Sequence, residues 1–216
     1  MNNPSIDLSK SGLFSKVSLL LTISLVISAL GTYMGQGITS GAGYIVLLVL
    51  FFAGAFVVPK TAKKSTSAGV TALTVWTFIS GLFLGPCIHH YAHALGWKTV
   101  FLTYLGSGGV MAVCGAIGAL SGFNFSRLGR FLFFSLLGLL AVGIFGIFVP
   151  MTAAVNIVYC LVGIALFSLF FMLDFFRLAH EENTWEAAID LTMSIYLDYI
   201  NVLLLLLRLI GIKVKD

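Results

Sequence analysis

Seven long runs of apolar residues divide almost the whole chain, and each is long enough to cross a lipid bilayer. A membrane-spanning helix needs about 20 such residues, with a range of about 17–25. The runs occupy residues 17–36, 42–58, 70–91, 99–120, 131–149, 153–173 and 187–212. Short connections rich in glycine, proline or charge separate them, which leaves no room for a soluble domain. The sequence therefore predicts an all-α integral membrane protein, with a tail at 1–16, a transmembrane domain at 17–212 and a tail at 213–216.

The scarcity of charge supports the same conclusion. Only 9% of the 216 residues are charged and 59% are apolar, whereas a soluble domain has roughly 25% and 45–50%. These polar side chains cannot cover a water-facing surface, so the protein's main partner is expected to be the lipid bilayer. The net charge of +4 does not indicate a nucleic-acid partner, because the basic residues follow the loops.

The basic residues predict the direction of the spans. Lys and Arg collect in cytoplasmic loops, and a cytoplasmic N-terminus places all but one of the loop cations inside. Only Lys98 then lies in an outside loop, against Lys10, Lys16, Lys60, Lys63, Lys64, Arg127, Arg130 and Arg177 inside. The first run has no cleavage pattern and is expected to be a retained helix. If the seventh run spans fully, Lys213 and Lys215 lie outside; a re-entrant seventh segment is the alternative.

Ionisable residues concentrate at the end of the chain. Asp174 closes the sixth run, and Asp198 lies in the middle of the seventh. At about 100° per residue, the polar residues of the seventh run share a stripe about 80° wide. These residues are Asp190, Ser194, Asp198, Asn201 and Arg208. A carboxylate at membrane depth costs at least about 2.5–3.5 kcal/mol, so such a helix should be surrounded by protein.

Two interpretations of Asp198 follow from the residues. In the first, Asp198 only fixes the packing of the helices, either because Arg208 or Asn201 holds it or because it stays neutral. In the second, Asp198 acts together with Asp174. Two carboxylates close together tend to share one proton, which makes them sensitive to pH. Once deprotonated they offer oxygen ligands for transient binding of a hard cation such as Ca²⁺. Arg177, one turn after Asp174, is a candidate counter-charge.

The chain resembles bacterial members of the Bax inhibitor-1 (transmembrane BAX inhibitor motif) family along nearly its whole length. The resemblance is carried by FISGLFLGPCIHHYA in the third run and VGIFGIF in the fifth. It is strongest in FSLFFMLDFFRLAH and MSIYLDYINVLLLLLRLIG near the end of the chain. An acid ending the sixth helix, then Y-x-D-x-x-N and a late Arg, is the most specific part of the pattern.

This resemblance implies a seven-helix fold in which the other six helices enclose the last one. It also implies a pH-sensitive Ca²⁺ leak channel whose sensor and gate are a pair of aspartates, here Asp174 and Asp198. The family pattern has an acid in the second helix and an Arg at its cytoplasmic end, where this chain has Leu48 or a neighbour and Pro59-Lys60. Lys60 is then a weaker, non-bidentate substitute for that Arg, as a counter-charge that would latch the closed state. Ca²⁺ is expected as the permeant ion, with no resident cofactor.

Other functions remain as alternatives. Another branch of the family is similar to a modulator of a membrane-anchored ATP-dependent protease, so regulation of another membrane protein is the second hypothesis. A serine hydrolase would need Gly two places before Ser107, but Leu105 stands there, so we expect no enzyme. The compact length favours a bacterial plasma membrane, with an organelle membrane left open.

Several smaller signals predict packing. Three widely separated cysteines, Cys87, Cys114 and Cys160, are expected to be free. Gly31/Gly35, Gly81/Gly85 and Gly118/Gly122 have the spacing of helix-packing glycines. For His89, His90 and His93 we expect interfacial packing, with pH sensing and a metal site as alternatives.

Overall fold

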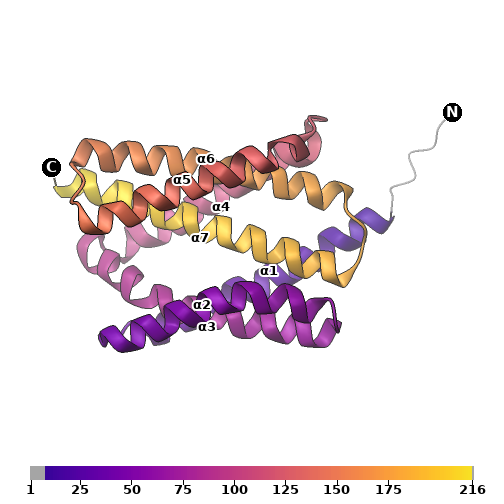
Figure 1. Ribbon diagram of the computed structural model, residues 1–216, viewed down its shortest axis with the longest axis horizontal. Coiled ribbons are helices and arrows are strands. Elements are labelled where there is room, and N and C mark those ends of the chain that lie inside the picture. Colours follow the sequence, from indigo (N-terminus) through magenta and orange to yellow (C-terminus); the bar gives the residue numbers. More distant parts are fainter. Residues whose placement is uncertain (1–7, 216) are drawn as a thin grey trace. The chain divides into compact units, whose positions relative to one another are not determined.

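The computed structural model describes residues 8–215, with side chains from residue 12 to 212 (Figure 1). Its helices are α1 (Leu8–Gly35), α2 (Gly41–Ala62), α3 (Thr66–Leu95), α4 (Trp97–Leu120), the short 3₁₀ helix η1 (Phe125–Leu128), α5 (Gly129–Phe148), α6 (Ala153–His180) and α7 (Trp185–Lys215). Seven of them are long and apolar enough to span a membrane. The described part of the chain holds no strand. The prediction of an all-α membrane protein with seven spans is confirmed.

Several helices run further than the apolar runs. Pro59 lies in the last turn of α2, the three histidines lie inside α3, and α6 continues past Arg177 to His180. Pro59, His93 and Arg177 lie outside the apolar runs 42–58, 70–91 and 153–173, so these three helices are longer than the sequence predicted. The helices extend because a backbone leaving the bilayer still satisfies its hydrogen bonds best within a helix. Parts of the two expected tails, with the side chains of Lys10, Lys213 and Lys215, lie outside the described residues.

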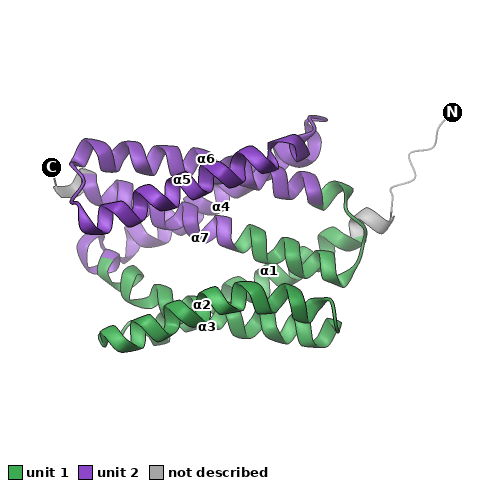
Figure 2. Ribbon diagram, viewed as in Figure 1, with its two compact units in different colours: residues 1–90, 178–196 green, residues 91–177, 197–216 purple. Residues whose placement is uncertain are grey.

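The chain divides into two compact units, shown in Figure 2. Unit 1 comprises residues 1–90 and 178–196, and therefore α1, most of α3, all of α2 and the first part of α7. Unit 2 comprises residues 91–177 and 197–216, and holds α4, η1, α5, nearly all of α6 and the rest of α7.

Glycines set the closest helix contacts in unit 1. A Cβ at Gly85 would lie 2.7 Å from the Cα of Gly35, and one at Gly31 would lie 3.1 Å from the Cα of Gly81. Neither distance leaves room for a side chain, so the backbones of α1 and α3 touch. The expected packing role of these four glycines is confirmed.

In unit 2, Gly118 brings α4 against α6, where a Cβ would lie 2.7 Å from the Cα of Met172. Its expected partner Gly122 has a different role. Gly122 follows α4 with φ of 68° and has open space around it. It supplies the left-handed turn that ends a helix, which a residue with a side chain adopts less readily.

Helix α7 is the most buried of the spans. Half of its most apolar window is buried, against 6–44% for the other six. In unit 1 Ile189, Ile195 and Tyr196 are fully buried, and in unit 2 Leu203 and Leu207 are. This burial fits a last helix that is surrounded by protein; of its predicted polar stripe, Asp198 is buried and Asp190, Ser194, Asn201 and Arg208 are half-buried.

Candidate functional site: a buried pair of aspartates

Asp174 of α6 and Asp198 of α7 both belong to unit 2. Their residues are 2% and 6% exposed, and the two carboxyl groups are close enough for their charges to interact. Each sits in a regular helix whose other residues are mostly apolar. Two acidic groups therefore share a site that is largely closed to water.

Arg177 contacts one member of the pair. Its Nη1 lies 3.5 Å from Oδ1 of Asp174, one helical turn away. The arginine side chain is 33% exposed, whereas that of Asp174 is 2% exposed. The ion pair thus joins a buried carboxylate to a cation at the edge of the protein. The weak geometry of this contact makes it easy to break.

Asp198 is held differently. Its Oδ2 is buried and accepts no hydrogen bond from the described residues. Asn201 donates instead to the carbonyl of Leu197 at 2.8 Å, within its own helix. Arg208 also has other partners, described next. The interpretation in which Asn201 or Arg208 holds Asp198 is therefore wrong.

Arg208 binds α6. Its Nη2 donates to Oδ1 of Asn156, and its guanidinium lies 4.9 Å from the centre of the Tyr159 ring. Both partners belong to unit 2. Asn156 also donates to the carbonyls of Met151 and Thr152 at 3.0 and 3.2 Å. Sequence reasoning missed this cluster, although a lone asparagine near the start of an apolar run was its available signal.

The rest of the predicted stripe lies in unit 1. Asp190 lines a cavity of about 380 Å³ with Glu182, Glu186 and Lys63, and Ser194 is half-buried. Lys60 is exposed in the last turn of α2, also in unit 1. Asp174, Asp198, Arg177, Asn201 and Arg208 are thus grouped in unit 2, and the role of Lys60 as a latch stays a prediction.

A buried hydroxyl cluster in unit 1 was not foreseen. The hydroxyl of Tyr196 lies 2.7 Å from Oγ of Ser28 and 2.8 Å from Oγ of Ser80. All three residues are buried, and the Tyr196 ring meets Trp76 edge-on at 5.6 Å between centroids. This cluster joins α1, α3 and α7. Serines spaced through apolar runs were its only sign in the sequence.

Ser107, the cysteines and possible metal sites are the remaining candidates from the sequence. Ser107 donates to the carbonyl of Thr103 at 2.9 Å, so its hydroxyl is occupied by its own helix. The three cysteines are free, as expected. Within the described residues no group of three or more His, Cys, Asp or Glu side chains is placed to hold a metal.

Comparison with known proteins gives a consistent picture. The family model described as "Inhibitor of apoptosis-promoting Bax1" matches residues 10–215. "Bax inhibitor 1" of Schizosaccharomyces pombe is 28% identical over 168 residues, which cover 78% of this chain and 59% of the yeast protein. An "Uncharacterized membrane protein" of Vibrio cholerae is 32% identical over 202 residues, covering 89% of this chain and 86% of that one. A membrane protein of Streptococcus pyogenes is 25% identical over 177 residues, covering 79% and 73%.

Proposed function

The chain belongs to the Bax inhibitor-1 family of multi-pass membrane proteins, and from this premise we propose that it is a proton-controlled cation leak channel. The permeant ion is Ca²⁺, and the Asp174–Asp198 pair is both sensor and gate. One observation carries the proposal: two buried, interacting carboxyl groups from α6 and α7 lie in the same compact unit. Ionisable residues at membrane depth are costly and usually serve ion or proton pathways.

The number of oxygen ligands favours passage over storage. Tight Ca²⁺ sites use 6–8 oxygen ligands, and two carboxylates supply at most four. No larger acidic group adjoins them within the described residues. A cation held this weakly, with water completing its shell, is released again, which conduction requires.

A shared proton gives the gate its control. In the closed form the pair holds one proton, so only one negative charge is buried. Loss of that proton leaves two like charges in a site that excludes water, and their repulsion drives α6 and α7 apart. Water and a cation then enter between the carboxylates. On this account the flux rises as the pH rises and falls on acidification.

Arg177 steadies the closed form. Its ion pair with Asp174 offsets the one remaining charge of the pair while the second carboxyl keeps the proton. Its partial exposure lets it leave without entering lipid. An arginine in this position weakens the repulsion between the two aspartates and so sets the pH at which the gate opens.

We place the N-terminus on the cytoplasmic side of a bacterial plasma membrane. In unit 1, Lys16 donates to the carbonyl of Asn183 at 3.3 Å, and Lys63 lines a cavity with Glu181 and Glu182. The start of α1, the α2–α3 connection and the α6–α7 connection thus share one end of unit 1. Lys16 of α1 and Lys63 of the α2–α3 connection are both among the lysines that the positive-inside rule assigns to the cytoplasm.

Ca²⁺ flux into dye-loaded liposomes tests the proposal. Purified protein is reconstituted and the flux is followed as the pH is stepped from about 5 to 8, the range in which such switches operate. We expect flux that increases with pH. Asp198→Asn mimics the protonated form, so its flux should be low and independent of pH. An interaction of more than one pK unit between the two carboxyl groups corresponds to a factor of about ten in their protonation equilibrium. We therefore expect the flux of the parent protein to change by about that factor or more over this range.

Asn201→Ala is the matched control, since it removes a polar group of the same stripe whose amide, among the described residues, donates within its own helix. This variant should keep the pH response of the parent. A response that survives in Asp198→Asn, or that rises on acidification, would contradict the gate. Absence of flux from well-folded protein at every pH would favour a regulator of other membrane proteins instead.

A further inference from the structure

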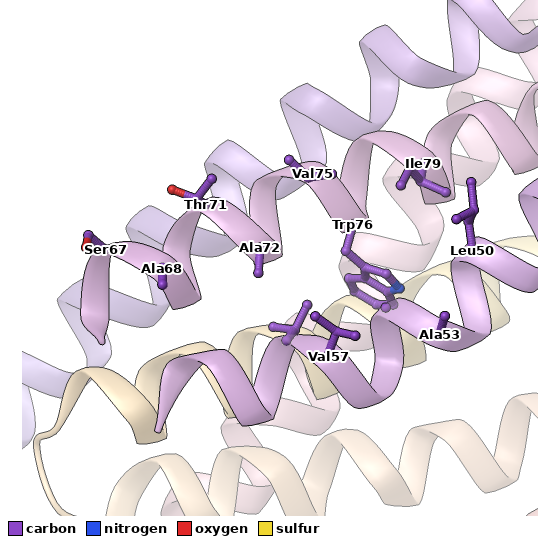
Figure 3. Close-up of a pocket in the computed structure, with 12 residues that line it drawn as sticks. Leu50, Ala53, Val57, Ser67, Ala68, Thr71, Ala72, Val75, Trp76 and Ile79 are labelled. Atoms are coloured by element: carbon purple, nitrogen blue, oxygen red, sulfur yellow. The ribbon is translucent and has the colours of Figure 1, made fainter. Parts of the chain in front are cut away.

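A long apolar groove runs between α2 and α3 in unit 1, well away in sequence from the aspartates. It has a volume of about 600 Å³. Figure 3 shows Ala68, Ala72 and Trp76 of α3 facing Val57 of α2 across it. The small side chains leave the groove open, and Trp76 forms its floor. Its shape and chemistry suit a hydrocarbon chain.

The Trp76 ring is held rigidly in this floor. Its Nε1 donates to the carbonyl of Phe51 at 2.9 Å, and the two rings stack with centroids 5.6 Å apart. Gly54 makes room for it, because a Cβ there would lie 2.9 Å from Cγ of the indole. The floor of the groove is therefore fixed before any occupant arrives.

One end of the groove is positively charged. On α2 the groove-lining residues Leu50, Ala53 and Val57 recur every three or four positions, and Lys60 in the last turn continues that spacing. Lys64 lies in the turn that joins α2 to α3, and Ser67 at the start of α3 lines the groove. Both lysines are exposed. Among the described residues, neither lysine forms an ion pair. The apolar face of α2 thus ends at Lys60, and a second exposed cation, Lys64, follows in the turn toward α3.

Lys63 lies on the opposite face. It lines the separate polar cavity with Pro59, Ala62 and four acidic residues. These acids offset the charge of Lys63, whereas the residues that line the groove include no acid. Lys63 is therefore a natural control for the other two lysines.

The start of α3 adds a third favourable feature at the same end. Helix α3 begins at Thr66, and Ser67 and Ala68 of its first turn line the groove. The free N–H groups and positive end of a helix dipole favour an anion. The hydroxyls of Ser65 and Ser67 lie 3.0 Å apart there and are exposed.

We propose that this groove binds an anionic phospholipid. One acyl chain lies along the groove on Trp76, and the headgroup phosphate lies at Lys60, Lys64 and the N-terminus of α3. A general coating of lipid would show no headgroup preference. This site prefers an anionic headgroup, because two lysines and a helix dipole meet where the chain ends.

Quenching of Trp76 by brominated lipid tests the site. Trp97→Phe and Trp185→Phe leave Trp76 as the one tryptophan of the three, in a protein checked for helical content and monodisperse elution. It is reconstituted with phosphatidylglycerol or phosphatidylcholine that carries bromine on the acyl chain. We expect phosphatidylglycerol to quench more strongly at equal mole fraction. Each lysine near an anionic lipid strengthens binding about fivefold, so the preference should be about 5- to 30-fold.

The lysine variants decide the assignment. Lys60→Gln with Lys64→Gln should abolish the headgroup preference, whereas Lys63→Gln should keep it. Native mass spectrometry of protein with all three tryptophans gives a second measurement, in which the double variant should retain less phosphatidylglycerol. Equal quenching by the two lipids, or a preference that survives the double variant, would overturn the proposal. Neither measurement depends on ion flux.

Discussion

At the scale of single residues, the polar side chains of α7 fall into three sets with different partners. Tyr196 joins the buried hydroxyls of Ser28 and Ser80, Asp198 faces the charge of Asp174, and Arg208 binds Asn156 and Tyr159. The first set joins α7 to α1 and α3, and the other two sets join it to α6. The position of α7 therefore depends on polar contacts as well as on apolar packing.

The hydroxyl cluster predicts the effect of Tyr196→Phe. The change keeps the ring but leaves Ser28 and Ser80 without their shared partner. Hydrogen bonds between helices in membranes average about 0.6 kcal/mol and reach about 1.7, so unfolding in mixed micelles should become easier by about that amount. Tyr33→Phe is the control, because Tyr33 is 74% exposed. Equal stability of the two variants would show that the cluster contributes nothing.

The sequence predicted the aspartates but not their surroundings. Charged residues inside an apolar run or at its end stand out by composition alone, so Asp198, Asp174 and Arg177 were identified. The partners of Arg208 depend on how α6 and α7 are rotated about their axes, which no spacing rule fixes. The alternative in which Asn201 holds Asp198 meets a local obstacle: the asparagine amide donates to the carbonyl of Leu197 within its own helix.

At the scale of helices, close backbone contact defines the pairs that cannot easily move. In unit 2 Gly118 places α4 directly against the backbone of α6 near Met172. Helix α6 carries Asp174 two residues later. A gate that moves α6 relative to α7 must therefore move α4 with it or loosen this contact.

This contact predicts a clear difference between two glycines of α4. Gly118→Ala places a Cβ 2.7 Å from the Cα of Met172, whereas Gly109 has open space around it. Overpacking typically costs about 1–3 kcal/mol, so Gly118→Ala should lower the melting temperature in detergent. Gly109→Ala should leave the melting temperature unchanged or raise it, because Ala favours a helix more than Gly does. The reverse order would contradict the close contact of α4 with α6.

The helices themselves were largely predictable, and their ends were not. Hydropathy identifies the seven spans because lipid requires about 20 apolar residues per helix. It gives no information about where a helix stops in the headgroup region. There α6 continues to His180, and the side chain of Thr184 accepts the N–H of Ala187 at the start of α7.

At the scale of the whole molecule, proton control and lipid binding are assigned to different units. The aspartate pair lies in unit 2 and the groove in unit 1. Helix α7 contributes to both, with Tyr196 touching the Trp76 ring in unit 1 and Asp198 following two residues later in unit 2. The lipid proposal stands without the channel proposal, and each has its own test.

The central claim is that one proton shared by Asp174 and Asp198 controls cation passage. The most direct test follows that proton by infrared difference spectroscopy in the liposomes used for flux, stepping the pH. We expect a protonated-carboxyl band that disappears as the pH rises, with the same midpoint as the increase in Ca²⁺ flux. Asp198→Asn should remove both transitions together. A carboxyl band that titrates while flux stays constant, or flux that responds without it, would contradict the account.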